Sequence, residues 1–271
     1  MSKLVLHLGL HKTATTFLQN ELNNIKGTLE SCGVGYLPLD NTRKHITSKL
    51  GSLFSDFKSV NSLFKEDLGC VIISDENIIG GTEKPKINLF YPDAINRIKK
   101  VISLFPKHEV EVYITLRDFR TFTISMYSEY LRHYKYVSYE NYMESLDIKE
   151  LSWFPLIESI VSLEGVSKVY ILNFDEFPEK KTLLINSITQ GVVSAFEFKQ
   201  SPSRKTLTTE VIKFLSLFPE RSVDVLRKME ACKYIYGKRF QPYSNGQLLN
   251  SKCNLINEIE LIKKLNKVEI I

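Results

Sequence analysis

The sequence predicts an α/β fold with three layers, in which a central, mostly parallel sheet is covered by helices on both faces. Short, almost wholly apolar runs recur along the chain, and segments with apolar residues at helical spacing lie between them. Runs that are apolar throughout are typical of parallel strands buried on both faces. In folds of this kind, ligands bind at the carboxyl ends of the strands.

The apolar runs predict four strands, at 3–8, 70–74, 110–116 and 168–174. Helical spacing predicts helices at 15–26, 92–105, 119–134, 156–164, 208–218, 220–233 and 254–266. Signals between residues 31 and 67 are mixed, because two glycines and a proline mark turns there. We find no repeat, low-complexity tract or linker, so we expect residues 1–271 to form one domain with C-terminal helices.

Composition excludes several classes of protein. A chain of 271 residues with 43% hydrophobic residues can bury a sizeable core. The net charge of +5 mildly favours anionic ligands, but Lys and Arg form no blocks, so we expect no nucleic-acid partner. No apolar segment is long enough to span a membrane, and the N-terminus lacks the pattern of a signal peptide. We expect a cytoplasmic protein.

The cysteines are widely spaced and form no C-x-x-C pair. They are Cys32, Cys70, Cys232 and Cys253. This spacing predicts reduced, mostly buried thiols, and neither a zinc site nor a disulfide framework.

The first candidate site follows the first strand. An apolar run breaks at Gly9, then one lysine, Lys12, stands among small hydroxyl residues at the start of a helix. A strand, a tight turn and a helix N-terminus aim backbone amides and the helix dipole at a phosphate-like anion. The alternative is an ordinary polar turn with a threonine N-cap. The segment is not a Walker A loop, since Lys12 follows Gly9 by three positions with no second glycine.

This segment reads His11-Lys12-Thr13-Ala14-Thr15-Thr16. It resembles the 5′-phosphosulfate loop of sulfotransferases that use 3′-phosphoadenosine 5′-phosphosulfate (PAPS), which usually reads P-K-S-G-T-T. His11 in place of proline is the departure, and the form H-K-T-[GA]-T-T is similar to that of many bacterial members. The resemblance implies that Lys12 and the residues Thr13, Ala14, Thr15 and Thr16 bind the donor.

The second candidate site joins a strand to a helix. Arg117 follows the strand at 110–116, and Ser125 lies eight residues later. An arginine before the helix and a serine two turns into it can bind one phosphate together. Alternatively, Arg117 and Asp118 cap the helix and Ser125 has no role. The pair resembles the 3′-phosphate site of the same sulfotransferases, R-[ND]-P followed by S-x-Y, with Phe119 in place of proline.

The resemblance implies a P-loop-like sulfotransferase with PAPS as donor, 3′-phosphoadenosine 5′-phosphate (PAP) as product and no metal. In such enzymes a late basic loop often closes over the 3′-phosphate or adenine, and Arg204 and Lys205 are the candidates here. Lys12 is the candidate for the group that contacts the leaving phosphosulfate oxygens. No match covers the acceptor side.

A general base must come from a strand end that faces the loop. Glu76 is the first candidate, with a capping or salt-bridged carboxylate as the alternative. His11 is the next candidate and could assist Lys12, whereas His7 alternates with apolar neighbours and is expected to be a core histidine.

The acceptor is expected to be a hydroxyl of a glycan or glycolipid. Tyrosines repeat at helical spacing beside Ser125, and they could stack on a sugar or simply belong to the core. Two other functions stay open. The run Val71–Glu76 loosely mimics a Walker B strand of a kinase or NTPase, and a nucleotide-binding member of the fold without activity would share both motifs.

Overall fold

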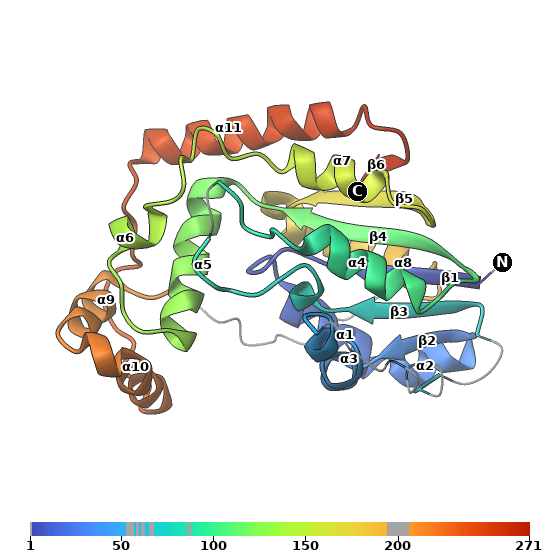
Figure 1. Ribbon diagram of the computed structural model, residues 1–271, viewed down its shortest axis with the longest axis horizontal. Coiled ribbons are helices and arrows are strands. Elements are labelled where there is room, and N and C mark those ends of the chain that lie inside the picture. Colours follow the sequence, from blue (N-terminus) through green and yellow to red (C-terminus); the bar gives the residue numbers. More distant parts are fainter. Residues whose placement is uncertain are drawn as a thin grey trace.

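A computed structural model describes residues 2–52, 57, 60, 63–64, 68–85, 88–193 and 206–271. Within this part of the chain, six strands form one sheet in the order β2-β3-β1-β4-β5-β6, and every neighbouring pair is parallel (Figure 1). The strands are β1 (Ser2–His7), β2 (Val34–Leu37), β3 (Cys70–Ser74), β4 (His108–Leu116), β5 (Val166–Asn173) and β6 (Val268–Ile270).

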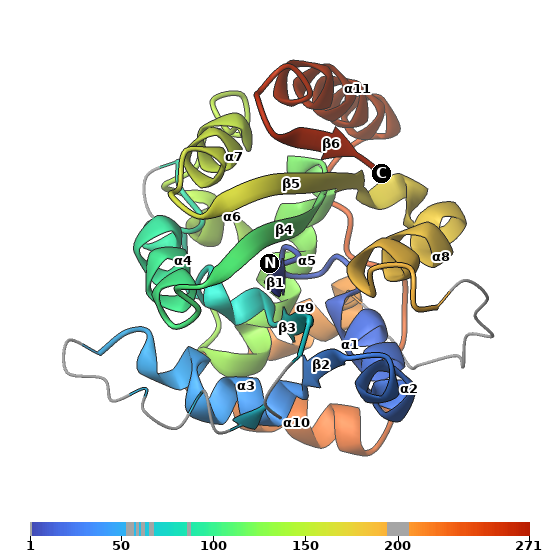
Figure 2. The same ribbon diagram turned by 90° about the vertical axis from the view of Figure 1, so that its right-hand side faces the viewer.

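Helices cover both faces of the sheet (Figure 2). On one face lie α1 (Thr15–Asn24), α2 (Lys26–Ser31) and α8 (Phe177–Ile188). On the other lie α3 (Leu39–His45), α4 (Ala94–Ser103) and α7 (Phe154–Val161), with α11 (Asn245–Ile262) packed against α7. The predicted three-layer α/β class is therefore confirmed.

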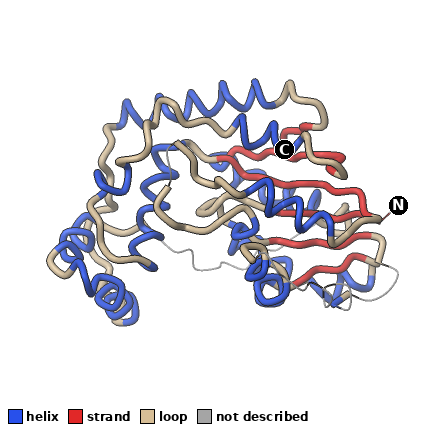
Figure 3. The backbone as a smooth tube through the Cα atoms, viewed as in Figure 1, coloured by secondary structure: helices blue, strands red, loops and turns tan. Residues whose placement is uncertain are grey.

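The remaining helices gather beyond the carboxyl ends of the strands (Figure 3). They are α5 (Phe119–His133), α6 (Tyr139–Met143), α9 (Thr209–Ser216) and α10 (Ser222–Ala231). Short 3₁₀ turns include η1 (Thr47–Lys49), η3 (Glu76–Ile78), η4 (Phe174–Glu176) and η5 (Pro219–Arg221). Helix α5 follows β4 directly and contacts both α10 and α11.

The sheet has an apolar core on each side because successive side chains of a strand point to opposite faces. Leu4 and Leu6 of β1 pack into the core under α4 and α7, whereas Val5 packs into the core under α1 and α8. Burial on both faces explains why the strands read as continuous apolar runs.

All four predicted strands are present, and two further strands were missed. β2 is a short edge strand with a glycine at its second position, and β6 has three residues, so neither carries a recognisable apolar run. Helix α8 was not predicted, and α11 begins well before residue 254. Ser244 and Gln247 form a capping box that sets the start of α11.

The prediction that the cysteines are mostly buried is wrong. All four are free thiols, but Cys32, Cys232 and Cys253 are exposed and Cys70 alone of the four is buried. No helix in the described ranges combines the length and apolarity needed to cross a bilayer.

The strand order reverses around β1. From β1 the chain first builds β3 and β2 on one side and then β4, β5 and β6 on the other. The loops after β1, β3 and β4 therefore meet at the carboxyl edge, where ligands bind in open parallel sheets.

Candidate active site

The loop after β1 is a strained turn closed by its own side chains. Gly9 has a φ of +53°, and Lys12 and Ala14 both have a φ of +64°, a region that non-glycine residues rarely adopt. The amide of Leu10 donates to Thr13 Oγ1 at 3.1 Å, and the Thr13 hydroxyl donates to the Leu10 carbonyl at 2.6 Å. Backbone strain of this kind persists only where surrounding contacts enforce it, which is typical of binding sites.

Helix α1 begins at the end of this loop. Ala14 is its N-cap, and its carbonyl accepts the amides of Phe17 and Leu18. The amides of Thr15 and Thr16 precede the first intrahelical bonds, so they are donors for an external acceptor. A helix N-terminus that opens with two threonines next to a lysine is suited to hold an anion.

Arg117 ties this loop to the end of β4. Its Nη1 donates to the Lys12 carbonyl at 2.8 Å, and its Nε donates to Thr121 Oγ1 at 3.0 Å. The guanidinium carbon lies 4.7 Å from the centre of the Phe174 ring, within cation–π range. Burial lowers the pKa of Arg117 to about 10, so the side chain stays cationic at neutral pH. The two predicted motifs therefore meet in one place.

Both motifs line one cavity of about 1470 Å³. Its lining includes the predicted residues His11, Lys12, Ala14, Thr15, Thr16, Glu76, Arg117 and Ser125. Thr13 is fully buried and does not line the cavity, because its hydroxyl bonds to Leu10 within the loop. The structure thus gives the Thr13 side chain the task of shaping the loop.

Arg204 and Lys205 lie outside the described residues. The structure instead brings another late basic residue, Arg239, into the cavity beside Thr208. The positive charge of Arg239 acts to lower the pKa of Arg117, and both side chains line the cavity. The sequence reasoning missed Arg239. Its signal is weak, since Lys238-Arg239 is one of several basic pairs in the chain and no spacing links it to the other motifs.

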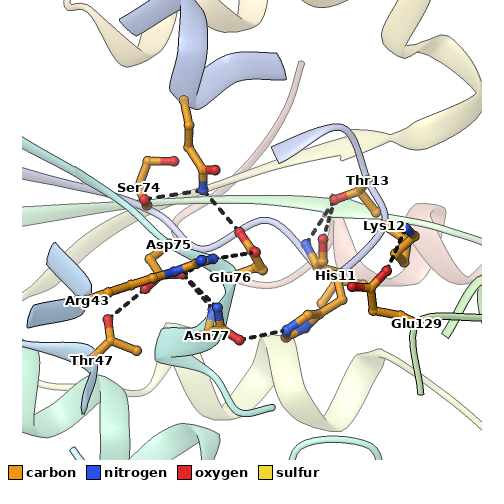
Figure 4. A network of polar contacts seen from close by, with 12 residues as sticks. His11, Lys12, Thr13, Arg43, Thr47, Ser74, Asp75, Glu76, Asn77 and Glu129 are labelled. Carbon is orange, nitrogen blue, oxygen red and sulfur yellow. Dashed lines mark hydrogen bonds and ion pairs between the residues drawn. The ribbon is translucent and has the colours of Figure 1, made fainter. Parts of the chain in front are cut away.

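Glu129 was also missed. This carboxylate on α5 forms an ion pair with Lys12, with Nζ and Oε2 separated by 3.2 Å (Figure 4). Only about a tenth of either side chain is exposed. Glu129 lies one helical turn after Ser125, so both residues face the same side of α5. A sequence signal therefore existed, because a helix that presents Ser125 to a ligand also presents the residue four positions later.

Both ring nitrogens of His11 are hydrogen-bonded within the protein. The Asn77 amide group donates to Asp75, which directs the Asn77 Oδ1 toward His11 Nε2 at 3.2 Å. Nε2 therefore carries the hydrogen, and Nδ1 accepts from the Tyr91 hydroxyl at 3.0 Å. Burial lowers the pKa of His11, against smaller effects of neighbouring groups, which favours this neutral ring.

The Glu76 carboxylate is turned toward Arg43 (Figure 4), and it also accepts a hydrogen bond from Gln19. Arg43 Nη2 lies 3.1 Å from Oε1, and Gln19 Nε2 donates to Oε2 at 3.0 Å. Burial alone would raise the pKa of Glu76, but the nearby His11 ring and the backbone amide of Glu76 outweigh it. Arg43 and Gln19 add to them, so the pKa lies below its ordinary value. Such a carboxylate is ionised but takes up a proton weakly, which favours a binding or positioning task.

His7 is the buried core histidine that the sequence predicts. Its Nδ1 lies 2.7 Å from the hydroxyl of Ser74, and burial lowers its pKa to about 4. The tyrosines near Ser125 divide between core and cavity. Tyr127 and Tyr142 are fully buried, whereas Tyr134 lines the cavity, with its ring stacked 4.9 Å from that of Tyr130.

No protein-family model matches the sequence, and no curated protein matches it. Among solved structures, the chain is similar to a sulfotransferase from Alicyclobacillus acidocaldarius, with a TM-score of 0.46 and 13% sequence identity. The likeness covers 84% of this chain and 96% of that chain. It is too distant to assign an activity, which rests on the residues of this chain. In the described ranges, no group of three or more His, Cys, Asp or Glu side chains is arranged to hold a metal ion.

Proposed function

We propose that the protein is a sulfotransferase that moves the sulfuryl group of PAPS to a hydroxyl acceptor. The observation that carries this proposal is the hydrogen bond from Arg117 Nη1 to the Lys12 carbonyl, with both residues lining one cavity. Two motifs that are distant in sequence then face the two phosphate groups of a single nucleotide.

The residues present fit such a donor. A Cβ on Gly9 would lie 2.3 Å from the Thr15 methyl carbon, so this close turn requires a glycine. The turn leaves the amides of Thr15 and Thr16 for the 5′-phosphate. Arg117 and Ser125 are suited to the 3′-phosphate, because arginine binds phosphate through two parallel hydrogen bonds. Arg239 adds a second positive charge on the same side.

Lys12 supplies the charge that the reaction needs. Negative charge grows on the leaving oxygen as the sulfuryl group departs, and a preorganised cation at that point stabilises the transition state. The lysine extends from the strained loop beside the proposed 5′-phosphate site, so its ammonium can reach the leaving oxygen. Catalysis here consists of positioning and electrostatics, as in phosphoryl transfer.

The cavity has room for an acceptor beside the donor. Its volume of about 1470 Å³ exceeds the range of roughly 300–1,000 Å³ that is typical of small-ligand pockets. Besides the two motifs, the lining of the cavity includes polar and aromatic groups, namely Arg43, Glu76, Asn77, Thr82, Glu83 and Tyr134. Hydrogen-bonding side chains with an aromatic ring suit a sugar, so we propose a glycan or glycolipid hydroxyl as acceptor.

A phosphoryl-transfer function is the competing proposal. Asp75 directly follows β3, which pairs with β1, where the acidic residue of a Walker B strand would lie. However, Asp75 is fully buried and accepts hydrogen bonds from Thr47 and from the amide of Asn77. Its oxygens are committed to holding η1 and η3 in place, which favours a structural task for this carboxylate.

A thermal-shift titration with PAP, ADP and Mg-ATP separates the candidates. A ligand at a hundred times its Kd stabilises a protein by about 2.7 kcal/mol, a rise of roughly 5–10 °C for a chain of this size. We expect PAP to give this rise and Arg117→Ala to remove it. A rise with Mg-ATP alone would contradict the proposal in favour of a kinase. No rise with PAP, in a folded protein, would also reject it.

A further inference from the structure

His133 lies at the end of α5 and lines the cavity. Its side chain is about half exposed, and its Nε2 lies 3.2 Å from Oε1 of Glu129. A carboxylate accepts hydrogen bonds and donates none, so the hydrogen of the neutral ring sits on Nε2. Nδ1 is then the nitrogen that can accept a proton, and no partner within the described residues engages it.

Glu129 joins this imidazole to Lys12. One carboxylate oxygen, Oε1, contacts His133, and the other, Oε2, contacts Lys12 Nζ at 3.2 Å. Arg132 Nη1 also contacts Oε2 at 3.2 Å, so the carboxylate is held from several directions. A buried carboxylate that fixes one ring nitrogen and leaves the other toward the substrate is the arrangement that orients a catalytic histidine.

We propose that His133 is the general base that accepts the proton of the acceptor hydroxyl, and that Glu129 positions it. This inference rests on the proposed function. The acceptor oxygen bonds to sulfur while the bond from sulfur to the 5′-phosphate oxygen breaks. The hydroxyl proton moves to His133 Nδ1, and the electron pair of the broken bond stays on the 5′-phosphate oxygen beside Lys12. The products are a sulfate ester, PAP and a protonated imidazole.

The geometry favours His133 over the two candidates that the sequence indicates. Both ring nitrogens of His11 are hydrogen-bonded, to Tyr91 and to Asn77. Glu76 faces Arg43 and Gln19, and its lowered pKa makes it a weak base. His133 is fixed through a single carboxylate to the lysine proposed to stabilise the leaving group.

The test measures PAP release from PAPS, with water and with octyl β-D-glucoside as acceptors. His133→Ala should lower the rate by about 10²–10³-fold, and added imidazole should restore part of it, because a general base contributes about 10²–10⁴. Glu129→Gln should lower kcat with little change in the KM for PAPS, because the amide no longer fixes the tautomer and orientation of the ring. His108→Ala is the matched control, since His108 begins β4 at the opposite edge of the sheet. It should keep the wild-type rate.

Each variant is first titrated with PAP in a thermal-shift assay, which shows that it is folded and binds the nucleotide. If the wild type turns over PAPS and the His133→Ala variant does so at the same rate, the inference is overturned. It is also overturned if the variant is slow and added imidazole does not raise its rate. In both cases the proposed function still stands. A wild-type protein that binds PAP but turns over PAPS with neither acceptor also overturns it, since a poised base must at least activate water. Failure of the wild type to bind PAP removes the proposed function, and this inference with it.

Discussion

The two sides of the cavity, taken with the residues that support them, are built in different ways. We call the residues Gly9–Thr16, Arg117 and Ser125 the donor half, and Arg43, Thr47 and Asp75–Asn77 the β3 half. The donor half owes its shape to backbone: positive φ angles, a helix N-terminus and an arginine that binds a main-chain carbonyl. The β3 half is a network of side chains, in which two adjacent carboxylates are neutralised by Arg43.

This difference fits two different tasks. A site made of backbone amides recognises phosphate groups, which are the same in every turnover. A site made of side chains, such as Arg43, Glu76 and Asn77 on the cavity wall, changes its hydrogen-bonding groups with each substitution. On the proposed function, the donor half binds a constant nucleotide and the β3 half meets the acceptor. Variants in the donor half should therefore change PAP binding or kcat, whereas variants in the β3 half should leave PAP binding unchanged.

Lys12→Ala tests the chemical task of the donor half and should have the largest effect. Loss of one preorganised charge at the transition state costs about 10²–10³ in kcat. PAP affinity should weaken much less, because the amides of Thr15 and Thr16 remain. Steady-state kinetics with PAPS and a PAP titration measure the two effects. Full turnover in the Lys12→Ala variant would show that Lys12 does not stabilise the leaving oxygen.

Arg117→Lys tests the binding task of the same half. Lysine keeps the charge but cannot bind a phosphate through two parallel hydrogen bonds or reach the Lys12 carbonyl in the same geometry. We expect PAP to bind about 10–100-fold more weakly, with a smaller change in kcat at saturating PAPS. Equilibrium titration gives the Kd. Arg120→Lys, on the adjacent helix α5 with its side chain outside the cavity lining, is the control and should bind PAP as the wild type does.

Much of the donor half could be predicted because its determinants are local. The apolar runs predict the strands, and the loop and Arg117 each follow a strand directly. Parallel strands bring their carboxyl ends to one edge, so the meeting of the two motifs follows from the fold class. The sequence could not show that Arg117 binds the Lys12 carbonyl, since this contact joins residues 105 positions apart.

The rest of the site depends on long-range packing. Glu129 contacts Lys12 across 117 positions, and His11 meets Tyr91 across 80. Arg239 reaches the cavity through the bridge between its own strand-like segment and Thr208. No spacing rule connects such residues, so a sequence can suggest that Glu76 is a base without showing that Arg43 and Gln19 already hold it.

Gly9→Ala asks whether the donor half needs its backbone shape. The φ of +53° and the 2.3 Å approach of the Thr15 methyl carbon to an added Cβ both oppose alanine. We expect the free energy of unfolding to fall by about 1–3 kcal/mol, a drop in Tm of roughly 3–10 °C. Gly27→Ala is the matched control, because nothing lies within 4 Å of its added Cβ and alanine favours the helix. An equal effect of both substitutions would contradict the strained-turn description.

Glu76→Gln probes the β3 half and should have the smallest effect. The substitution removes one of the two carboxylate partners of Arg43 while keeping a hydrogen-bond acceptor for Gln19, so the free energy of unfolding should fall by about 1 kcal/mol. PAP affinity should not change, because no residue of the donor half loses a hydrogen bond. Glu164→Gln, an exposed carboxylate outside the cavity lining, is the control for the loss of one negative charge.

The stability difference between the wild type and the Glu76→Gln variant should depend on pH. The folded-state pKa of Glu76 lies below the ordinary value of 4.5, so the ionised carboxylate stabilises the folded protein above that pH. The contribution disappears as the pH falls through the lowered folded-state pKa. Denaturant titrations of the wild type and the Glu76→Gln variant should therefore differ at pH 7 and converge in acid. A difference that stays constant with pH would mean that the charge of Glu76 does not stabilise the β3 half, and weaker PAP binding would mean that the two halves are coupled.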